Sequence, residues 1–234
     1  MPDDIRLKVV LCWHMHQPQY RDLMSGIYHL PWTYLHAVKD YTDMAAHLEA
    51  VPAARAVINF APLLLEQIED YAKQVDGFLT NSLAIRDPLL AALVSPALLP
   101  AEEERMLLVK ACLRANEARM IGRFPAYQRL AEMAVWFTAH PESLRYLSNQ
   151  YLADLLVWYH LAWLGETVRR DDARIKRLLK KESGYSLHDR RELLTVIGEL
   201  LSNLIPRYRQ LAARGQVELS VTPYAHPIVP LLLD

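Results

Sequence analysis

The stretch Cys12–Pro18, with the sequence CWHMHQP, follows the apolar run LKVVL near the start of the chain. The run is rich in β-branched residues, and a proline cannot donate a hydrogen bond to a sheet, so residues 6–16 are predicted to form a strand. Residues i and i+2 share one face of a strand, so His14 and His16 are expected to point the same way. Such a pair favours a functional role, either as metal ligands or as hydrogen-bonding partners of substrate hydroxyls.

Two more strands are predicted farther along the chain. Residues 56–60 form a short apolar run, and the segment 217–223 alternates between apolar and polar side chains until Pro223 ends it. Apolar spacing and helix-capping residues predict helices over the rest, at 33–50, 62–77, 100–122, 125–137, 143–164, 176–181 and 186–214.

Strands that alternate with helices indicate an α/β fold with a parallel sheet, here helix-rich and with a large helical insertion at about residues 78–184. Parallel strands end at the same edge of a sheet. Five polar side chains are therefore expected to converge on one rim, where barrel folds place their functional groups: His14, His16, Gln17, Asn59 and His226.

Composition excludes several classes of function. The formal net charge is −1 over 234 residues with no long basic block, which argues against nucleic-acid and anionic-membrane partners. No signal-like segment and no membrane-length apolar run is found. The two cysteines, Cys12 and Cys112, are expected to be free thiols in a reducing, cytoplasmic setting. Phosphate-binding glycine loops, Cys-x-x-Cys pairs and nucleophile elbows are absent from the sequence.

Other residues have competing interpretations. Glu218 lies on the polar face of the third strand, where a salt bridge and a supporting role in catalysis are equally plausible. Trp32 follows the first strand's loop and is the better candidate for stacking on a sugar ring. Helix packing is the preferred explanation for the other tryptophans of the helical region, Trp136, Trp158 and Trp163. The triple Lys39–Tyr41 is expected to be a solvated helix face.

Three motifs together resemble glycoside hydrolase family 57, the family of α-amylases, amylopullulanases, 4-α-glucanotransferases and branching enzymes. WHMHQP at residues 13–18 is similar to the family's first signature region, and LPW at 30–32 with HAVKDY at 36–41 follows it. GQVE at 215–218, leading to HPIVPL at 226–231, is similar to the second signature region. The resemblance covers essentially the whole chain.

The resemblance implies a (β/α)7 barrel and retaining chemistry on α-glucosidic bonds, which needs two carboxyl groups. In the family these belong to later signature regions, so no catalytic residue is expected within residues 1–234, and the chain alone is expected to be inactive. His14, His16 and Gln17 would line a sugar subsite, Glu218 and His226 would support it, and Trp32 is a weaker candidate. No cofactor and no metal is implied.

The chain is accordingly interpreted as the N-terminal part of one catalytic barrel, with the remainder of the barrel outside residues 1–234. The seven glycines and the apolar ending at residues 231–234 agree with that interpretation. The expected partner is an α-glucan or a maltooligosaccharide. The alternatives are a metal-dependent hydrolase of a related barrel, similar to α-mannosidases or deacetylases, and a non-catalytic carbohydrate-binding fragment. Hydrolysis versus transglycosylation, linkage preference and oligomeric state are left open.

Overall fold

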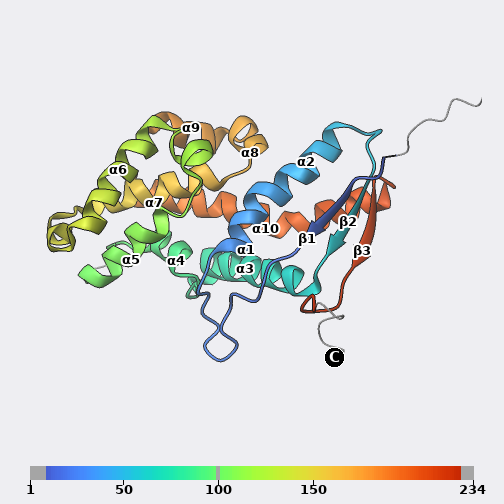
Figure 1. The fold of residues 1–234 in the computed structure, drawn as a ribbon, viewed down its shortest axis with the longest axis horizontal. Coiled ribbons are helices and arrows are strands. Elements are labelled where there is room, and N and C mark those ends of the chain that lie inside the picture. The colour runs from blue at the N-terminus through green and yellow to red at the C-terminus, as the bar shows by residue number, and fades with distance from the viewer. Residues whose placement is uncertain (1–8, 99–100, 228–234) are drawn as a thin grey trace, which may run out of the picture.

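The computed structural model describes residues 9–98 and 101–227 (Figure 1). Three parallel strands form one sheet in the order β1-β2-β3: β1 is Cys12–Met15, β2 is Ala56–Phe60 and β3 is Val217–Val221. The sheet stands at one end of the molecule, and the helices extend away from it. The predicted α/β class with a parallel sheet and a helix-rich remainder is confirmed.

The two faces of the sheet differ in their surroundings. Met15, Ile58 and Phe60 point to the face that packs into the hydrophobic core, where the ring of Phe60 meets Tyr208 edge-on at 5.2 Å. The strand register places a second set of side chains on the opposite, more exposed face: Cys12, His14, Val57, Asn59, Glu218 and Ser220. That face presents its polar groups at the carboxyl ends of the strands.

Helices fill most of the described chain. Those between β1 and β2 are α1 (Trp32–His36), the π-helix η1 (Ala37–Tyr41) and α2 (Thr42–Ala50). Those between β2 and β3 are α3 (Pro62–Asn81), α4 (Pro88–Val94), α5 (Glu102–Cys112), η2 (Glu117–Ile121), α6 (Pro125–Ala139), η3 (Pro141–Tyr146), α7 (Asn149–Trp163), α8 (Glu166–Asp171), α9 (Ala173–Lys181) and α10 (Leu187–Ala213). Their status as an insertion into a barrel stays a prediction.

Local sequence explains where the longest helices begin. Pro62 occupies the first turn of α3, where its missing N–H costs no hydrogen bond. Ser186 and Asp189 form a complete capping box at the start of α10, as predicted. Helix α7 is buried on every side, and it forms the centre of the helical region (Figure 1).

The first and third strands are shorter than predicted. Residues 6–8 and the apolar ending at 231–234 lie outside the described residues. Val9 and Val10 are about three-quarters exposed and precede β1, although the carbonyl of Leu11 still accepts a hydrogen bond from the Val57 amide. Because these side chains stay exposed, extending β1 through them would bury little apolar surface. The third strand ends at Val221, two residues before the prediction.

Three predicted helix boundaries were wrong. Helix α3 passes Gly77 and ends at Asn81, before Ser82, which adopts a left-handed φ of 56°. The helix predicted for 100–122 ends at Cys112, and a separate π-turn begins after Asn116, whose side chain accepts from the Arg119 amide. The helix predicted for 143–164 starts at residue 149, because the Ser148 hydroxyl caps it.

Candidate functional site

A row of polar side chains crosses the sheet one residue before its carboxyl end. The register aligns His14, Asn59 and Ser220 across β1, β2 and β3. Nδ1 of His14 lies 2.7 Å from Oδ1 of Asn59, and Nδ2 of Asn59 donates to Oγ of Ser220 at 3.0 Å. A carbonyl oxygen can only accept, so Nδ1 of His14 carries the proton and its Nε2 is left with a free lone pair.

Two more histidines join this row from the loops that follow β1 and β3. The ring centroid of His226 lies 4.6 Å from that of His14 and 4.7 Å from that of His16. One ring nitrogen of each of the three residues lies within 4.8 Å of the others. His226 has a left-handed φ of 52°, an unfavourable backbone state for a residue with a Cβ. The predicted convergence of His14, His16, Asn59 and His226 is therefore observed.

The surroundings of His16 favour its neutral form. Burial lowers the pKa of His16, and the neighbouring His226 and His14 lower it further, because each proton would repel the next. Neutral imidazoles act both as hydrogen-bond donors and as acceptors for hydroxyl groups, and they are the form that ligates metals. Among the described residues, these three histidines form the group with metal-ligand spacing.

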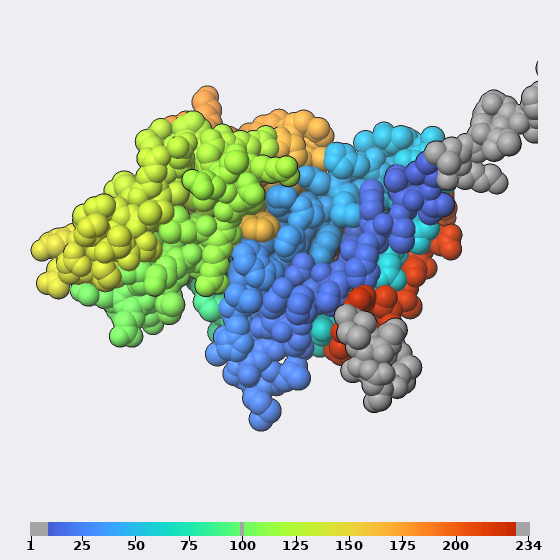
Figure 2. Space-filling view, viewed as in Figure 1, coloured from blue at the N-terminus to red at the C-terminus, as the bar shows by residue number. Residues whose placement is uncertain are grey.

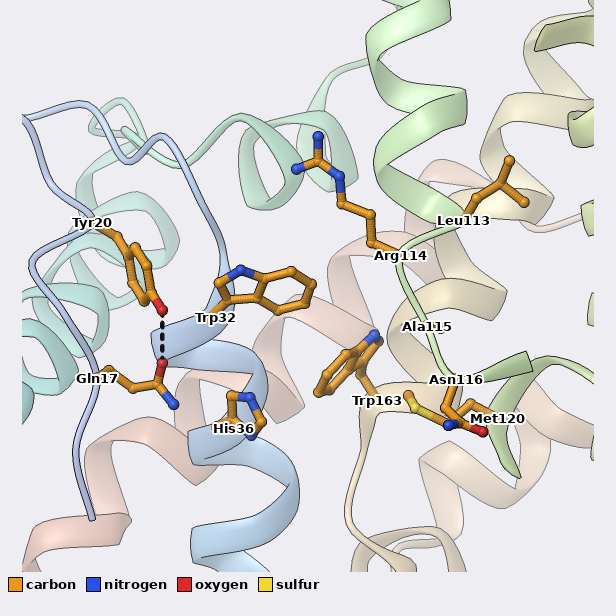
Figure 3. A pocket seen from close by; sticks show the side chains of 10 residues that line it. All are labelled: Gln17, Tyr20, Trp32, His36, Leu113, Arg114, Ala115, Asn116, Met120 and Trp163. Carbon is orange, nitrogen blue, oxygen red and sulfur yellow. Dashed lines mark hydrogen bonds between the residues drawn. The ribbon is translucent and has the colours of Figure 1, made fainter. Parts of the chain in front are cut away.

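Gln17, which was expected at the rim, lines a neighbouring pocket instead. Oε1 of Gln17 accepts a hydrogen bond from the Tyr20 hydroxyl at 3.1 Å. Nε2 of Gln17 donates a long hydrogen bond to the Tyr41 hydroxyl at 3.4 Å. The pocket has a volume of about 560 Å³. Figure 3 shows the side chains that line it: Gln17, Tyr20, Trp32, His36, Leu113, Arg114, Ala115, Asn116, Met120 and Trp163.

Aromatic rings form one wall of this pocket. The ring centroids of Trp32 and Trp163 are 5.7 Å apart, and His36 meets Trp163 edge-on at 5.4 Å. Helix α7 supplies Trp163, for which the sequence predicted helix packing alone. Trp163 is only 7% exposed and does pack on other helices, but it also faces the pocket (Figure 3). Helical periodicity could not reveal this, because a pocket-facing residue and a core residue share the same spacing.

The segment Lys39–Tyr41 is not the solvated helix face that was predicted. Tyr41 is buried, and Asp40 accepts hydrogen bonds from Nδ1 of His36 at 2.5 Å and from Nζ of Lys39 at 2.7 Å. Burial tends to raise the pKa of Asp40, but these two hydrogen bonds outweigh it and the net pKa is lowered. The surrounding π-helix η1 is a local distortion of the type that often accompanies functional sites.

Glu218 does not join the histidines. Its register partner is Val57, one row before the His14–Asn59–Ser220 row, and its side chain is exposed. Among the described residues it forms no ion pair, so the salt bridge considered for it is not observed. Both cysteines are free, as predicted, with Cys12 exposed and Cys112 buried.

The sheet, the histidine cluster and the aromatic pocket all fall within one family match. The model of glycosyl hydrolase family 57 matches residues 10–234. The chain belongs to glycosyl hydrolase family 57. Comparisons with curated proteins and with solved structures gave no match.

Membership in glycosyl hydrolase family 57 assigns the chain to the glycoside hydrolases, so carbohydrate is its class of partner. In the three motifs that carry the resemblance, His14, His16 and His226 lie at the rim, and Trp32 and His36 line the pocket, whereas residues 215–218 lead into the start of β3. Within the described residues, no helix combines the length and the apolar character that crossing a membrane requires.

Proposed function

We propose that this chain forms the N-terminal wall of an α-glucan-binding cleft in an enzyme that cleaves or transfers α-glucosidic bonds. The observation that carries the proposal is the aromatic pocket next to the histidine cluster in a chain of glycosyl hydrolase family 57. Indole rings stack on the apolar C–H faces of hexoses, and polar groups around them bind the hydroxyls.

The pocket has the composition that a sugar ring requires. Trp32 and Trp163 present aromatic surface, while Arg114 and Asn116 bring hydrogen-bonding groups from the loop after α5 (Figure 3). Its volume of about 560 Å³ falls in the ordinary range of small-molecule sites. Trp32 therefore becomes a stronger candidate than the sequence indicated, and Trp163 is added to it.

One bound oligosaccharide could reach both parts of the site. Gln17 lines the pocket and follows His16 directly in the chain, and His16 belongs to the histidine cluster. A glucan chain that stacks on Trp32 would thus extend toward the rim, where the imidazoles of His14, His16 and His226 would bind hydroxyls of the next sugar residue. Glu218 is proposed only to support the site from its margin, because it lies one row of the sheet before the His14–Asn59–Ser220 row.

The reacting carboxyl groups are proposed to lie outside residues 1–234, in the remainder of the same barrel. The cluster that the described residues place at the rim consists of imidazoles alone. Retaining hydrolysis requires a carboxylate nucleophile and a carboxylic acid/base. In this scheme the present chain binds and orients the sugar, while the later part of the barrel performs the bond cleavage.

The proposal is tested by titrating the chain with maltoheptaose and following tryptophan fluorescence, with cellohexaose as the matched β-linked control. Saturable binding of maltoheptaose that is weakened by Trp32→Ala supports it. A Trp136→Ala variant controls for the loss of an indole, because Trp136 is half exposed on α6 and outside the pocket. Equal affinity for both oligosaccharides, or no binding of either, would overturn the α-glucan assignment.

A further inference from the structure

We propose that His14, His16 and His226 form a binding site for a divalent transition-metal ion, with Zn²⁺ as the best chemical match. Imidazole nitrogen is a preferred ligand of Zn²⁺, and three protein ligands are enough for a site that keeps one open coordination position. The three residues come from two different strand ends, so folding brings their side chains together.

The nitrogen atoms lie close to the separations that one ion requires. The three ring nitrogens lie within 4.8 Å of one another. Ligands at about 2.1 Å from a tetrahedral ion are separated by about 3.4 Å, so each pair has to close by at most about 1.4 Å. Changes in the side-chain torsions of the three histidines would have to supply this closure.

The nitrogen atoms are available for an ion. His14 uses Nδ1 to donate to Asn59, which leaves its Nε2 free. Nε2 of His16 is shielded from solvent and has no hydrogen-bond partner among the described residues. A buried polar atom without a partner is costly, and an ion at the centre of the cluster would satisfy it.

A second layer of hydrogen bonds orients the first ligand. Metal-binding histidines ordinarily donate their other ring N–H to an oxygen acceptor, which sets both the tautomer and the ring orientation. Asn59 supplies that acceptor at 2.7 Å, and Ser220 in turn fixes the Asn59 amide at 3.0 Å. The row across the three strands is thus the support that a metal-binding imidazole needs.

Metal binding and sugar binding would exclude each other at this rim. The same three imidazoles are proposed to bind glucan hydroxyls. An ion held between them would occupy the nitrogen lone pairs that otherwise accept hydrogen bonds from those hydroxyls. This consequence rests on the proposed function, whereas metal binding itself does not. Zn²⁺ would then act as an inhibitor of glucan binding at the rim.

The experiment uses the metal alone. The chain is freed of metal with a chelator and titrated with Zn²⁺ by calorimetry, and Co²⁺ replaces Zn²⁺ for visible absorption spectroscopy. We expect one ion per chain and a Co²⁺ spectrum of tetrahedral type. His226→Ala is expected to weaken binding at least about a hundredfold, since it removes one of three ligands, and Asn59→Ala about tenfold.

His188→Ala is the matched control, because His188 is exposed in the first turn of α10 and away from the cluster. It is expected to leave the Zn²⁺ affinity unchanged. His14→Gln provides a second ligand variant of similar size, and circular dichroism identifies any variant that fails to fold. Absence of saturable Zn²⁺ binding, or less than a tenfold effect of both ligand variants in folded protein, would overturn the site. Neither result depends on whether maltoheptaose binds.

Discussion

Nδ1 of His14 lies 2.7 Å from Oδ1 of Asn59, although the two residues are 45 positions apart in the chain. The contact exists because β1 and β2 pair in parallel with these two residues in register. It fixes the His14 tautomer and leaves the other ring nitrogen, Nε2, with a free lone pair.

His16 is expected to be essential for turnover. In an active form of the enzyme that contains this chain, His16→Ala is predicted to lose most of the activity on maltooligosaccharides, because a hydrogen-bonding wall of the sugar subsite is removed. Steady-state kinetics on maltoheptaose measures the effect, and His188→Ala serves as the exposed control. Near-normal turnover by His16→Ala would contradict a subsite role.

The 234-residue chain alone is expected to hydrolyse no α-glucan. The nucleophile and the acid/base are proposed to lie elsewhere in the barrel, and such groups are worth many orders of magnitude in rate. Release of reducing sugar from maltoheptaose is measured against a heat-inactivated sample. Reproducible turnover by the purified chain would show that residues 1–234 contain a sufficient catalytic set.

The pair Trp32 and Trp163 is expected to contribute to oligosaccharide affinity. Replacing either by alanine removes an aromatic surface worth about 1 kcal/mol or more, so maltoheptaose binding should weaken about five- to tenfold. Trp136→Ala should leave affinity unchanged, because this side chain is half exposed on α6. If the three variants bind alike, the pocket is not the sugar site.

Acidification is expected to destabilise the helical region through His160. This residue is fully buried, and burial lowers its pKa to about 4. Its Nδ1 donates to the Leu156 carbonyl at 2.8 Å, so its neutral Nε2 accepts from the Tyr34 hydroxyl at 3.0 Å. The unfolded chain binds this proton below about pH 6.5, whereas the folded chain binds it only near pH 4, so stability falls as the pH drops between these values.

The size of this effect is measured by difference. Urea unfolding of the wild type and of His160→Gln is compared at pH 7 and pH 5, and His160 is expected to cost the wild type about 2 kcal/mol over that interval. Asp87, whose pKa burial raises to about 6, acts in the opposite direction, but both proteins contain it. Parallel pH profiles for the two proteins would rule out this role of His160.

Gly198 is expected to be required for the contact between α10 and α3. A Cβ at this position would lie 2.6 Å from Cγ1 of the buried Val75. Alanine normally stabilises a helix by about 1 kcal/mol relative to glycine, but here the clash should reverse the sign and destabilise by about 1–3 kcal/mol. Chemical unfolding measures the change. Combining Gly198→Ala with Val75→Ala should recover part of the loss, and additive effects of the two substitutions would contradict the clash.

Some features followed directly from local sequence. The strand at residues 56–60, the start of α3 at Pro62 and the capping box at Ser186 all appear where they were predicted. Each depends on residues within a few positions of one another. Helix ends were predicted less well, because the termini at Cys112 and Asn149 are set by capping hydrogen bonds that compete with the apolar pattern.

Sequence by itself determined the class of this protein and the histidines of its rim. Parallel β-strands end at a common edge, so histidines placed after β1 and β3 were expected at the same rim. Tertiary structure alone decided which other side chains belong to the site. It excluded Glu218 from the cluster by one step of register and brought Trp163 to the pocket across more than a hundred residues, because long-range packing has no local signature.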